Sequence, residues 1–143
     1  MTRFLTFAAF ALLPLLARGE GYNCIEDKVT GFAYRNGEWR ERNFKPDHKF
    51  IVRRPIQRDR TELSKTNAKW VIVWIGTEYP TALCPDDFDA QGSLVCRNRY
   101  DEFRINKSTL RFLYADLFGY WSSTDSEEER NTTTIAIGKC SPM

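Results

Sequence analysis

The sequence predicts an all-β fold, an antiparallel meander that forms a small barrel or a sandwich and is held by two disulfides. Three observations lead to this prediction. Short runs of β-branched and aromatic residues alternate with turn residues, no later stretch keeps an apolar period of 3.6 residues, and the chain has four cysteines. About eight such strands fit the chain, and closure into a barrel is one way for an all-β protein to avoid exposed edges.

Residues 1–19 are interpreted as a cleavable signal peptide. Arg3 supplies the positive charge, and a run of apolar or small residues follows from Phe4 to Leu16. This run is shorter than the roughly 20 residues that a membrane-spanning helix needs, and it fits the apolar region of a signal peptide. The alternative is an N-terminal core helix. We expect a periplasmic or secreted domain, residues 20–143, without a stable membrane anchor.

The mature chain is expected to carry no net charge. The full chain has 21 basic and 19 acidic side chains, and the signal peptide contains two of the basic ones, Arg3 and Arg18. A neutral domain gives no indication of binding to nucleic acid or to an anionic membrane. The partner class that we expect is a protein in the periplasm or outside the cell.

The four cysteines predict two disulfides in an oxidising compartment. Cys84 and Cys96 flank a short polar segment that can fold back on itself. Cys24 and Cys140 lie near the chain ends, which are often close together in a domain. Of the three possible pairings we expect Cys84 with Cys96 and Cys24 with Cys140. A zinc site is disfavoured because no two cysteines have the CxxC spacing.

The first half of the domain is expected to contain a hairpin and two further strands. Asn36-Gly37 lies between β-type runs at residues 31–34 and 38–40, and this dipeptide is a strong signal for a two-residue hairpin turn. Strands follow at residues 49–53 and 69–75. The second of these has apolar side chains on both faces, which is typical of a central strand covered on both sides.

The remaining chain predicts a second hairpin and a final strand. The hairpin joins residues 101–105 to 110–114, with Phe103 and Ile105 facing Leu110 and Phe112 on the inner side. The last strand is expected at residues 132–137. Residues 58–67 are read as a short helix or a long polar loop, and residues 122–130 as an acidic, polar loop.

No catalytic residue, cofactor-binding residue or metal ligand is assigned, and no cofactor is expected. His48 is the only histidine, and the sequence shows no nucleophile beside it. Residues 87–92 resemble the opening of a calcium loop, but the twelfth position is Asn98 rather than glutamate, so a solvated turn is preferred. Sequons at Asn106 and Asn131 would carry glycans only in a eukaryotic host, which the sequence does not reveal.

The candidate partner surface consists of a basic stretch and one tryptophan: Arg53, Arg54, Arg58, Arg60 and Trp121. Arginine forks suit carboxylate or phosphate groups on a partner, so an acidic partner would be steered by this stretch. Trp121 precedes the acidic loop, and of the four tryptophans it is the least typical of a core residue. The alternatives are a solvated charge run and a core tryptophan.

Two resemblances to known families add to these expectations. Gly37-Glu38-Trp39 resembles the GxW element of lipocalins, which implies an eight-stranded barrel that holds a ligand. A larger set of residues resembles a group of small exported bacterial proteins of unassigned function, and this implies a bacterial periplasmic or secreted product. The set comprises Gly31-Phe32, Tyr34, Trp39, Asn43-Phe44, Lys49-Phe50-Ile51-Val52, Phe103, Asn106, Leu110-Arg111-Phe112 and Ile137-Gly138-Lys139-Cys140-Ser141-Pro142.

Three function classes remain open after this reading. The first is a non-enzymatic binding module, such as a periplasmic inhibitor of a lytic enzyme of the lysozyme kind, and it should show a protruding loop. The second is a lipocalin-like carrier, which needs an apolar pocket of several hundred Å³. The third is a hydrolase with an unrecognised site, which needs a cleft where His48 or paired carboxylates meet.

Overall fold

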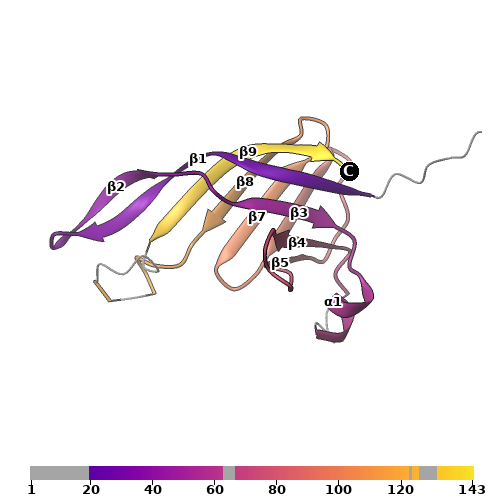
Figure 1. Ribbon diagram of the computed structural model, residues 1–143, viewed down its shortest axis with the longest axis horizontal. Helices are drawn as coiled ribbons and strands as arrows, with labels where there is room; N and C mark the ends of the chain where they lie inside the picture. The colour runs from indigo at the N-terminus through magenta and orange to yellow at the C-terminus, as the bar shows by residue number, and fades with distance from the viewer. Residues whose placement is uncertain (1–19, 63–66, 123, 126–131) are drawn as a thin grey trace, which may run out of the picture.

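Eight antiparallel strands close into a barrel in the computed structural model, which describes residues 20–62, 67–122, 124–125 and 132–143 (Figure 1). The strands follow the order β1-β3-β4-β5-β6-β7-β8-β9, and pairing of β1 with β9 closes the ring. The elements are β1 (Gly21–Arg35), β2 (Glu38–Phe44), β3 (Lys49–Arg53), α1 (Gln57–Glu62), β4 (Trp70–Trp74), β5 (Ala82–Cys84), β6 (Ser93–Arg97), β7 (Asp101–Asn106), β8 (Arg111–Asp116) and β9 (Thr133–Pro142). Of the two predicted architectures, a barrel and a sandwich, the structure is therefore the barrel. The expected signal peptide lies outside the described residues.

Strand β1 belongs both to the barrel and to a projecting hairpin. Its first residues, Gly21 to Ile25, pair with β3, whereas Val29 to Arg35 pair with β2. A bulge between Glu26 and Lys28 separates the two halves. Strand β2 pairs with β1 alone, so this hairpin extends beyond the ring (Figure 1). The predicted Asn36-Gly37 turn is confirmed, and both residues have the positive φ, 52° and 84°, that such a turn requires.

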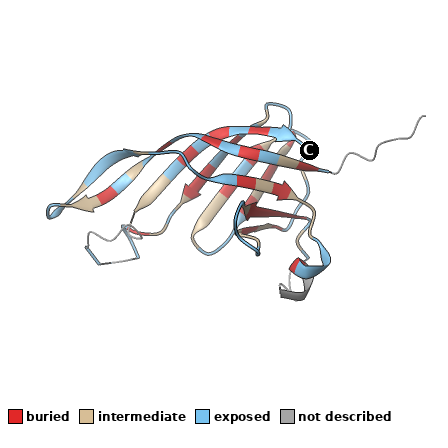
Figure 2. Ribbon diagram, in the orientation of Figure 1, coloured by how far each residue is buried: buried red, intermediate tan, exposed pale blue. Residues whose placement is uncertain are grey.

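Side chains fill the interior of the barrel. Inward and outward positions alternate along each strand, which Figure 2 shows as alternating burial. Phe50, which is fully buried, lies at the centre, and its ring centroid is 5.3–5.6 Å from those of Phe103, Phe112 and Tyr114. A barrel of eight strands is just wide enough for such a filling. The interior is thus a packed hydrophobic core.

Both predicted disulfides are confirmed. Cys24 in β1 and Cys140 in β9 face each other across the pair of strands that closes the ring, and Cys84 in β5 is joined to Cys96 in β6. The four side chains point into the core and are at most 7% exposed. Two such bridges are consistent with an oxidising, extracytoplasmic compartment.

Most predicted strands form close to their expected limits. Strand β3 spans the predicted residues 49–53, and β4 ends one residue before Ile75, which is exposed. Val71 and Val73 on the outer face of β4 are buried, as are Trp70 and Ile72 on the inner face, so coverage on both sides is confirmed. Strand β9 is longer than predicted, since it runs to Pro142.

The predicted contacts within the second hairpin need one correction. In an antiparallel hairpin, the predicted strands would place Ile105 opposite Leu110 and Phe103 opposite Phe112, but Ile105 pairs with Phe112 and Phe103 pairs with Tyr114. Leu110 lies in the turn with a φ of 55°, so the strand starts only at Arg111. The turn is therefore longer than the pattern indicated, and the partners of both residues shift by two positions.

The one helix of the described residues is short. It spans Gln57–Glu62, so it starts one residue before the stretch 58–67 predicted as a helix or a loop, and residues 63–66 of that prediction lie outside the description. In the described part of the chain, no helix has the length and apolar character that crossing a bilayer would require.

Candidate functional site

The residues of the candidate partner surface lie at opposite ends of the molecule. Helix α1 and the arginines beside it are at one end of the long axis, and the β1–β2 hairpin is at the other (Figure 1). Trp121 belongs to the hairpin end, because the ring of its neighbour Tyr120 packs against Trp39 of β2 at 5.1 Å. The arginine stretch and Trp121 therefore do not form one continuous surface.

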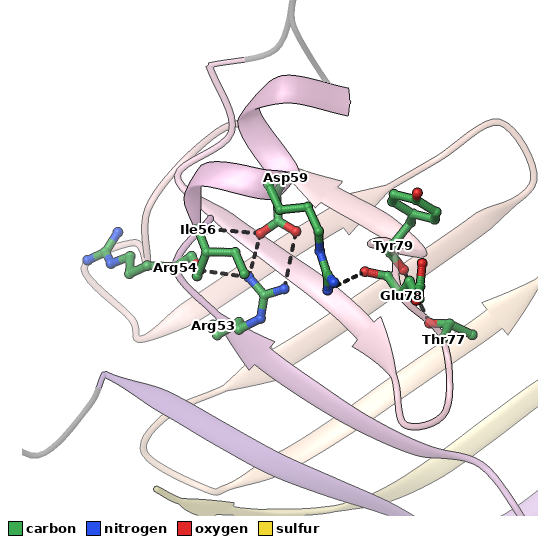
Figure 3. A network of polar contacts seen from close by, with 8 residues as sticks. Arg53, Arg54, Ile56, Asp59, Thr77, Glu78 and Tyr79 are labelled. Atoms are coloured by element: carbon green, nitrogen blue, oxygen red, sulfur yellow. Dashed lines mark hydrogen bonds and ion pairs between the residues drawn. The ribbon is translucent and has the colours of Figure 1, made fainter.

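Arg53 is used to hold α1 against β3. Its guanidinium donates to both carboxylate oxygens of Asp59, at 2.5 and 3.2 Å, and the backbone N–H of Ile56 donates to the same carboxylate at 2.9 Å (Figure 3). Asp59 is fully buried. Burial acts to raise the pKa of Asp59, but the hydrogen bonds from Arg53 and Ile56 outweigh it and the pKa is lowered. This is a structural ion pair.

Arg54 is held in a second internal network. Its guanidinium stacks 4.1 Å over the Trp70 ring and donates to Glu20 at 2.9 Å and to Asp87 at 3.0 Å. The Trp70 indole N–H, the Phe88 amide and Arg54 all donate to Asp87, and they lower the pKa of this carboxyl to about 2. Asp87 of the calcium-like loop is thus an acceptor within the fold.

Of the other two arginines in this stretch, the structure describes the side chain of one. Arg58 donates to the carbonyl oxygen of Glu78 at 2.9 Å, and the side chain of Arg60 lies outside the description. The guanidinium groups described here, those of Arg53, Arg54 and Arg58, therefore all have partners within the protein. Recruitment of a partner by this stretch stays a prediction.

Aromatic side chains gather near the tip of the projecting hairpin, where Tyr34 pairs with Trp39. The rings of Tyr34 and Trp39 lie 5.8 Å apart, and Tyr120 packs on the other side of Trp39. Tyr120 is 65% exposed and Trp121 69% exposed. We call this group the hairpin aromatic surface, and it consists of Tyr34, Trp39, Leu117, Tyr120 and Trp121.

The exposed rings of this surface are held in place. The Trp121 indole N–H donates to the carbonyl oxygen of Leu117 at 2.6 Å, and the Trp39 indole N–H donates to Asp125 at 2.9 Å. The Tyr120 amide donates to the hydroxyl of Thr133 at 3.3 Å. Trp121 is thus exposed as predicted, and its ring is held in one orientation while most of its surface remains in contact with solvent.

A polar cluster closes the barrel at the same end. Strands β3 and β7 begin here and β4 and β8 end here, so inward-facing residues at these ends meet. The structure brings together residues that lie far apart in the sequence and share no sequence pattern. We call this cluster the acidic mouth, and it consists of Glu26, His48, Trp74, Asp101, Tyr114 and Asp116.

Glu26 and His48 form one half of the acidic mouth. Glu26 is only 6% exposed, and one of its oxygens accepts the backbone N–H groups of Asp47 and His48 at 3.2 and 3.1 Å. Its other oxygen lies 3.2 Å from Nδ1 of His48. This hydrogen bond and the nearby negative charges outweigh partial burial and raise the pKa of His48 above 6.5.

Asp101 and Asp116 form the other half, as directly opposed residues of β7 and β8. Burial and then the charge of Asp101 raise the pKa of Asp116, while the Phe118 amide, which donates at 2.9 Å, and His48 act against this rise. Burial, the two aspartate charges and a side-chain hydrogen bond with Asp101 raise the pKa of Tyr114. Asp116 and the phenol of Tyr114 are thus both partly desolvated and lie close to the charge of Asp101.

Trp74 lies within the same cluster. Its ring stacks on that of His48 at 4.5 Å and meets Tyr114 edge-on at 6.2 Å. Its indole nitrogen is shielded from solvent and has no hydrogen-bond partner among the groups that the structure describes. A buried donor without an acceptor is rare in proteins.

Glu26, Asp47 and His48 also form the only group of three metal-ligand types that the described residues bring within 4.8 Å. Glu26 and Asp47, however, face different ring nitrogens, Nδ1 and Nε2 of His48. The buried Glu26 carboxylate is already held by three donors. This arrangement fits a structural contact that holds the β2–β3 loop against β1 better than it fits a cation site.

Sequence reasoning missed Glu26, although one signal was present. Cys24 must face inward if it pairs with Cys140, and Glu26, two residues later in the same strand, must then face inward as well. No known protein family, curated protein or solved structure matches the chain. The geometry of the two ends is therefore the basis for assigning a function.

Proposed function

We propose that the protein is an exported, non-enzymatic binding module that engages a protein partner through the hairpin aromatic surface. The observation that carries this proposal is the exposure of Trp121 and Tyr120, at 69% and 65%, beside a hairpin that projects beyond the barrel. Tryptophan and tyrosine, together with arginine, are the side chains most enriched among the residues that dominate binding energy at protein interfaces.

The fixed orientation of these rings favours binding. Trp121 is oriented by its bond to the Leu117 carbonyl, and Tyr120 is packed on Trp39. A side chain that is fixed before binding loses less conformational entropy when a partner covers it. The surface is therefore preorganised in the way that tight protein interfaces require.

Export is part of this proposal. The sequence pattern of residues 1–19 is typical of a signal peptide, and both disulfides are suited to a periplasmic or extracellular location. Inhibition of a lytic enzyme would use a projecting hairpin on a rigid, cross-linked barrel. We keep this role as the leading example of the binding class.

The carrier alternative has less support. The barrel interior is filled by rings such as Phe50 and Phe103, and hollows of about 460 and 670 Å³ lie at the α1 end and on the outer face of β5 and β6. Trp39 of the lipocalin-like element sits in β2, outside the ring. The hydrolase alternative would need a cleft where His48 or paired carboxylates meet, and neither of these two hollows is lined by His48, Asp101 or Asp116.

A capture experiment tests the proposal. The domain of residues 20–143 is immobilised as wild type, Trp121→Ala and Arg58→Glu, and each is exposed to an extract of exported host proteins. We expect a stoichiometric protein partner on the wild type and on Arg58→Glu, and a strongly reduced amount on Trp121→Ala. Equal capture by Trp121→Ala, or absence of any stoichiometric partner, would refute it. Melting curves of all three proteins serve as the folding control.

A further inference from the structure

We propose that the protein partner presents an acidic, partly apolar surface to the outer face of strands β3, β1, β9 and β8. This inference rests on the proposed function and names the chemistry of the partner. We call this region the basic face, and its outward side chains are Ile25, Lys49, Arg111, Leu113, Ile137 and Lys139.

One cross-strand row of the basic face contains three cations. Ile25 in β1 pairs with Lys49 in β3 on one side and with Lys139 in β9 on the other. Lys139 pairs in turn with Arg111 in β8, although like charges directly opposite each other destabilise a sheet. All four side chains are exposed. In the described part of the chain, none of the three cations takes part in an ion pair.

Exposed aliphatic side chains lie beside these cations. Ile25 is 53% exposed, Ile137 48% and Leu113 38%, and the last two are direct cross-strand partners. They alternate with inward-facing residues, as Figure 2 shows along β9. The face thus combines positive charge with an apolar surface, so that its ligand needs carboxylates and apolar groups close together.

A hollow of about 300 Å³ lies at the β8 side of the basic face. Its lining includes Val95, Leu113, Arg104 and Arg111. Arg104 is already paired with Glu102, so Arg111 supplies the guanidinium that this hollow offers to a ligand. A guanidinium beside apolar side chains suits a carboxylate, which it can bind through two parallel hydrogen bonds.

The acids of the neighbouring rows do not neutralise the basic face. Glu102 is shared between Arg97 and Arg104. Asp27 is exposed at the bulge of β1, where its chain neighbour Lys28 offsets its charge. Residues 20–143 contain equal numbers of basic and acidic side chains, so this local excess of positive charge is a result of the fold. An acidic partner would be attracted to this face although the domain as a whole is neutral.

Charge and shape favour a protein as the occupant. A second copy of the chain would bring two sets of these cations together, because a two-fold interface places the same patch on both subunits. A bilayer is flat, so it would meet the curved outside of a closed barrel along a narrow strip only. A protein surface can follow that curvature and place acids opposite Arg111 and Lys139.

Strand β9 joins the basic face to the hairpin aromatic surface. Its first residue, Thr133, accepts the Tyr120 amide at 3.3 Å, and the outward positions that follow are Ile135, Ile137 and Lys139. Six residues of a strand span about 20 Å. A standard interface of about 800 Å² per partner is roughly 30 Å across. One partner can therefore cover the exposed rings and also reach Lys139.

The first test uses defined probes and nuclear magnetic resonance, without the partner. The exported, disulfide-bonded protein is titrated with a pentapeptide that alternates glutamate and leucine, and with its glutamine counterpart. Vesicles of phosphatidylglycerol or of phosphatidylcholine form a separate arm. We expect saturable shifts of the backbone amide signals of Arg111, Ile137 and Lys139 with the glutamate peptide. The glutamine peptide should bind at least about tenfold more weakly, because the charge-assisted contacts are lost.

Two results of this titration would overturn the proposal. The first is an equal response to both peptides, or shifts that lie outside the basic face. The second is binding to phosphatidylglycerol vesicles without binding of the glutamate peptide, which would assign the face to lipid.

Matched variants locate the binding of the glutamate peptide. Arg111→Gln combined with Lys139→Gln should weaken it by about tenfold or more, and this variant should fold because it removes a repulsion between opposed cations. Arg42→Gln combined with Arg58→Gln removes the same charge from exposed positions outside the basic face, and it should leave binding unchanged. Equal weakening by the two variants would show unspecific attraction and reject the site.

A last variant tests the apolar part of the basic face. Ile137→Ser changes a half-exposed side chain without altering charge, and it should also weaken binding of the glutamate peptide. Unchanged binding would reduce the site to charge alone and overturn the apolar component of the proposal.

The captured partner separates this inference from the proposed function. Arg111→Glu combined with Lys139→Glu should slow association and remove most of its dependence on salt, because such charges steer the encounter. Capture that is reduced by Trp121→Ala but unaffected by this charge reversal would retain the proposed function and reject the basic face. Peptide binding at the basic face without any captured partner would retain the face as a site for acidic ligands and reject the proposed function.

Discussion

Both ends of the barrel contain charged and aromatic side chains, but the contacts that these side chains make differ between the two ends. At the α1 end, Arg53 is paired with buried Asp59, and Arg54 lies on Trp70 between two carboxylates. At the hairpin end, Asp101 and Asp116 face each other and Trp121 is exposed. Groups that satisfy one another inside the fold contribute to stability, whereas an exposed aromatic ring is available to a partner. The density of charge along the sequence therefore does not by itself locate a binding surface.

The largest expected difference between the ends concerns two tryptophans. Trp70→Ala should lower the free energy of unfolding by about 3 to 5 kcal/mol, because Trp70 is only 3% exposed and packs in the core. Trp121→Ala should cost less than about 1 kcal/mol, since most of its surface is already in water. Urea unfolding of both variants measures this. Similar losses for the two would show that Trp121 is a core residue and would remove it as a binding anchor.

The next effect concerns the ion pair of the α1 end. Asp59→Ala should destabilise the protein by about 3 kcal/mol or more, because it leaves the Arg53 guanidinium without its buried partner. Arg58→Ala, at an exposed position of the same helix, should change stability by no more than about 0.5 kcal/mol. Thermal or urea unfolding of the matched pair gives both values. A small loss of stability for Asp59→Ala would mean that the ion pair stabilises this end of the protein less than its contacts indicate.

A smaller effect should appear as a pH dependence from the hairpin end. The pKa of His48 is raised in the folded protein, so folding favours its protonated form. The stability that the contact with Glu26 contributes is therefore complete below the unfolded pKa of about 6.5 and is lost as the pH rises through the higher folded value. His48→Gln should abolish this part of the slope of stability against pH. An unchanged slope in that variant would assign the dependence to other groups.

The smallest effect, and the one of opposite sign, is expected for Asp116→Asn. The pKa of Asp116 is raised, so its ionised form is less favourable in the folded protein than in the unfolded chain at neutral pH. Replacing it by neutral asparagine should raise the melting temperature slightly at pH 7, and the gain should shrink as the pH falls and the aspartate takes up a proton. Stabilisation by removal of a charge is typical of a site that is kept for function. A clear drop in melting temperature would show that Asp116 is a structural acceptor.

Much of the barrel could be predicted because its signals are local. The Asn36-Gly37 turn, the apolar run of β4 and the spacing of Cys84 and Cys96 each lie within a short stretch. Strand β5 and the first half of β1 were not predicted, and neither has such a signal. Strand β5 has three residues, and the charged first half of β1 shows its alternation only once Cys24 is known to face inward.

The candidate site was less predictable, because it depends on closure of the ring. Exposure of Trp121 followed from its position before a polar loop and is confirmed. The contact between Glu26 and His48 requires the pairing of β1 with β3, and the pairing of Asp101 with Asp116 requires the correct register of β7 and β8. The misplaced Leu110 shows how a single turn residue alters that register. Long-range contacts of this kind have no pattern in the linear sequence.

The central claim is that the hairpin end, and not the arginine end, binds the partner. The most direct measurement is the dissociation rate of the captured partner from the wild type, Trp121→Ala and Arg58→Glu. Loss of an aromatic anchor is worth about 2 kcal/mol or more, so Trp121→Ala should dissociate roughly thirtyfold faster. Arg58→Glu should dissociate at the wild-type rate. Faster dissociation of Arg58→Glu together with an unchanged rate for Trp121→Ala would contradict the account and move the binding surface to the α1 end.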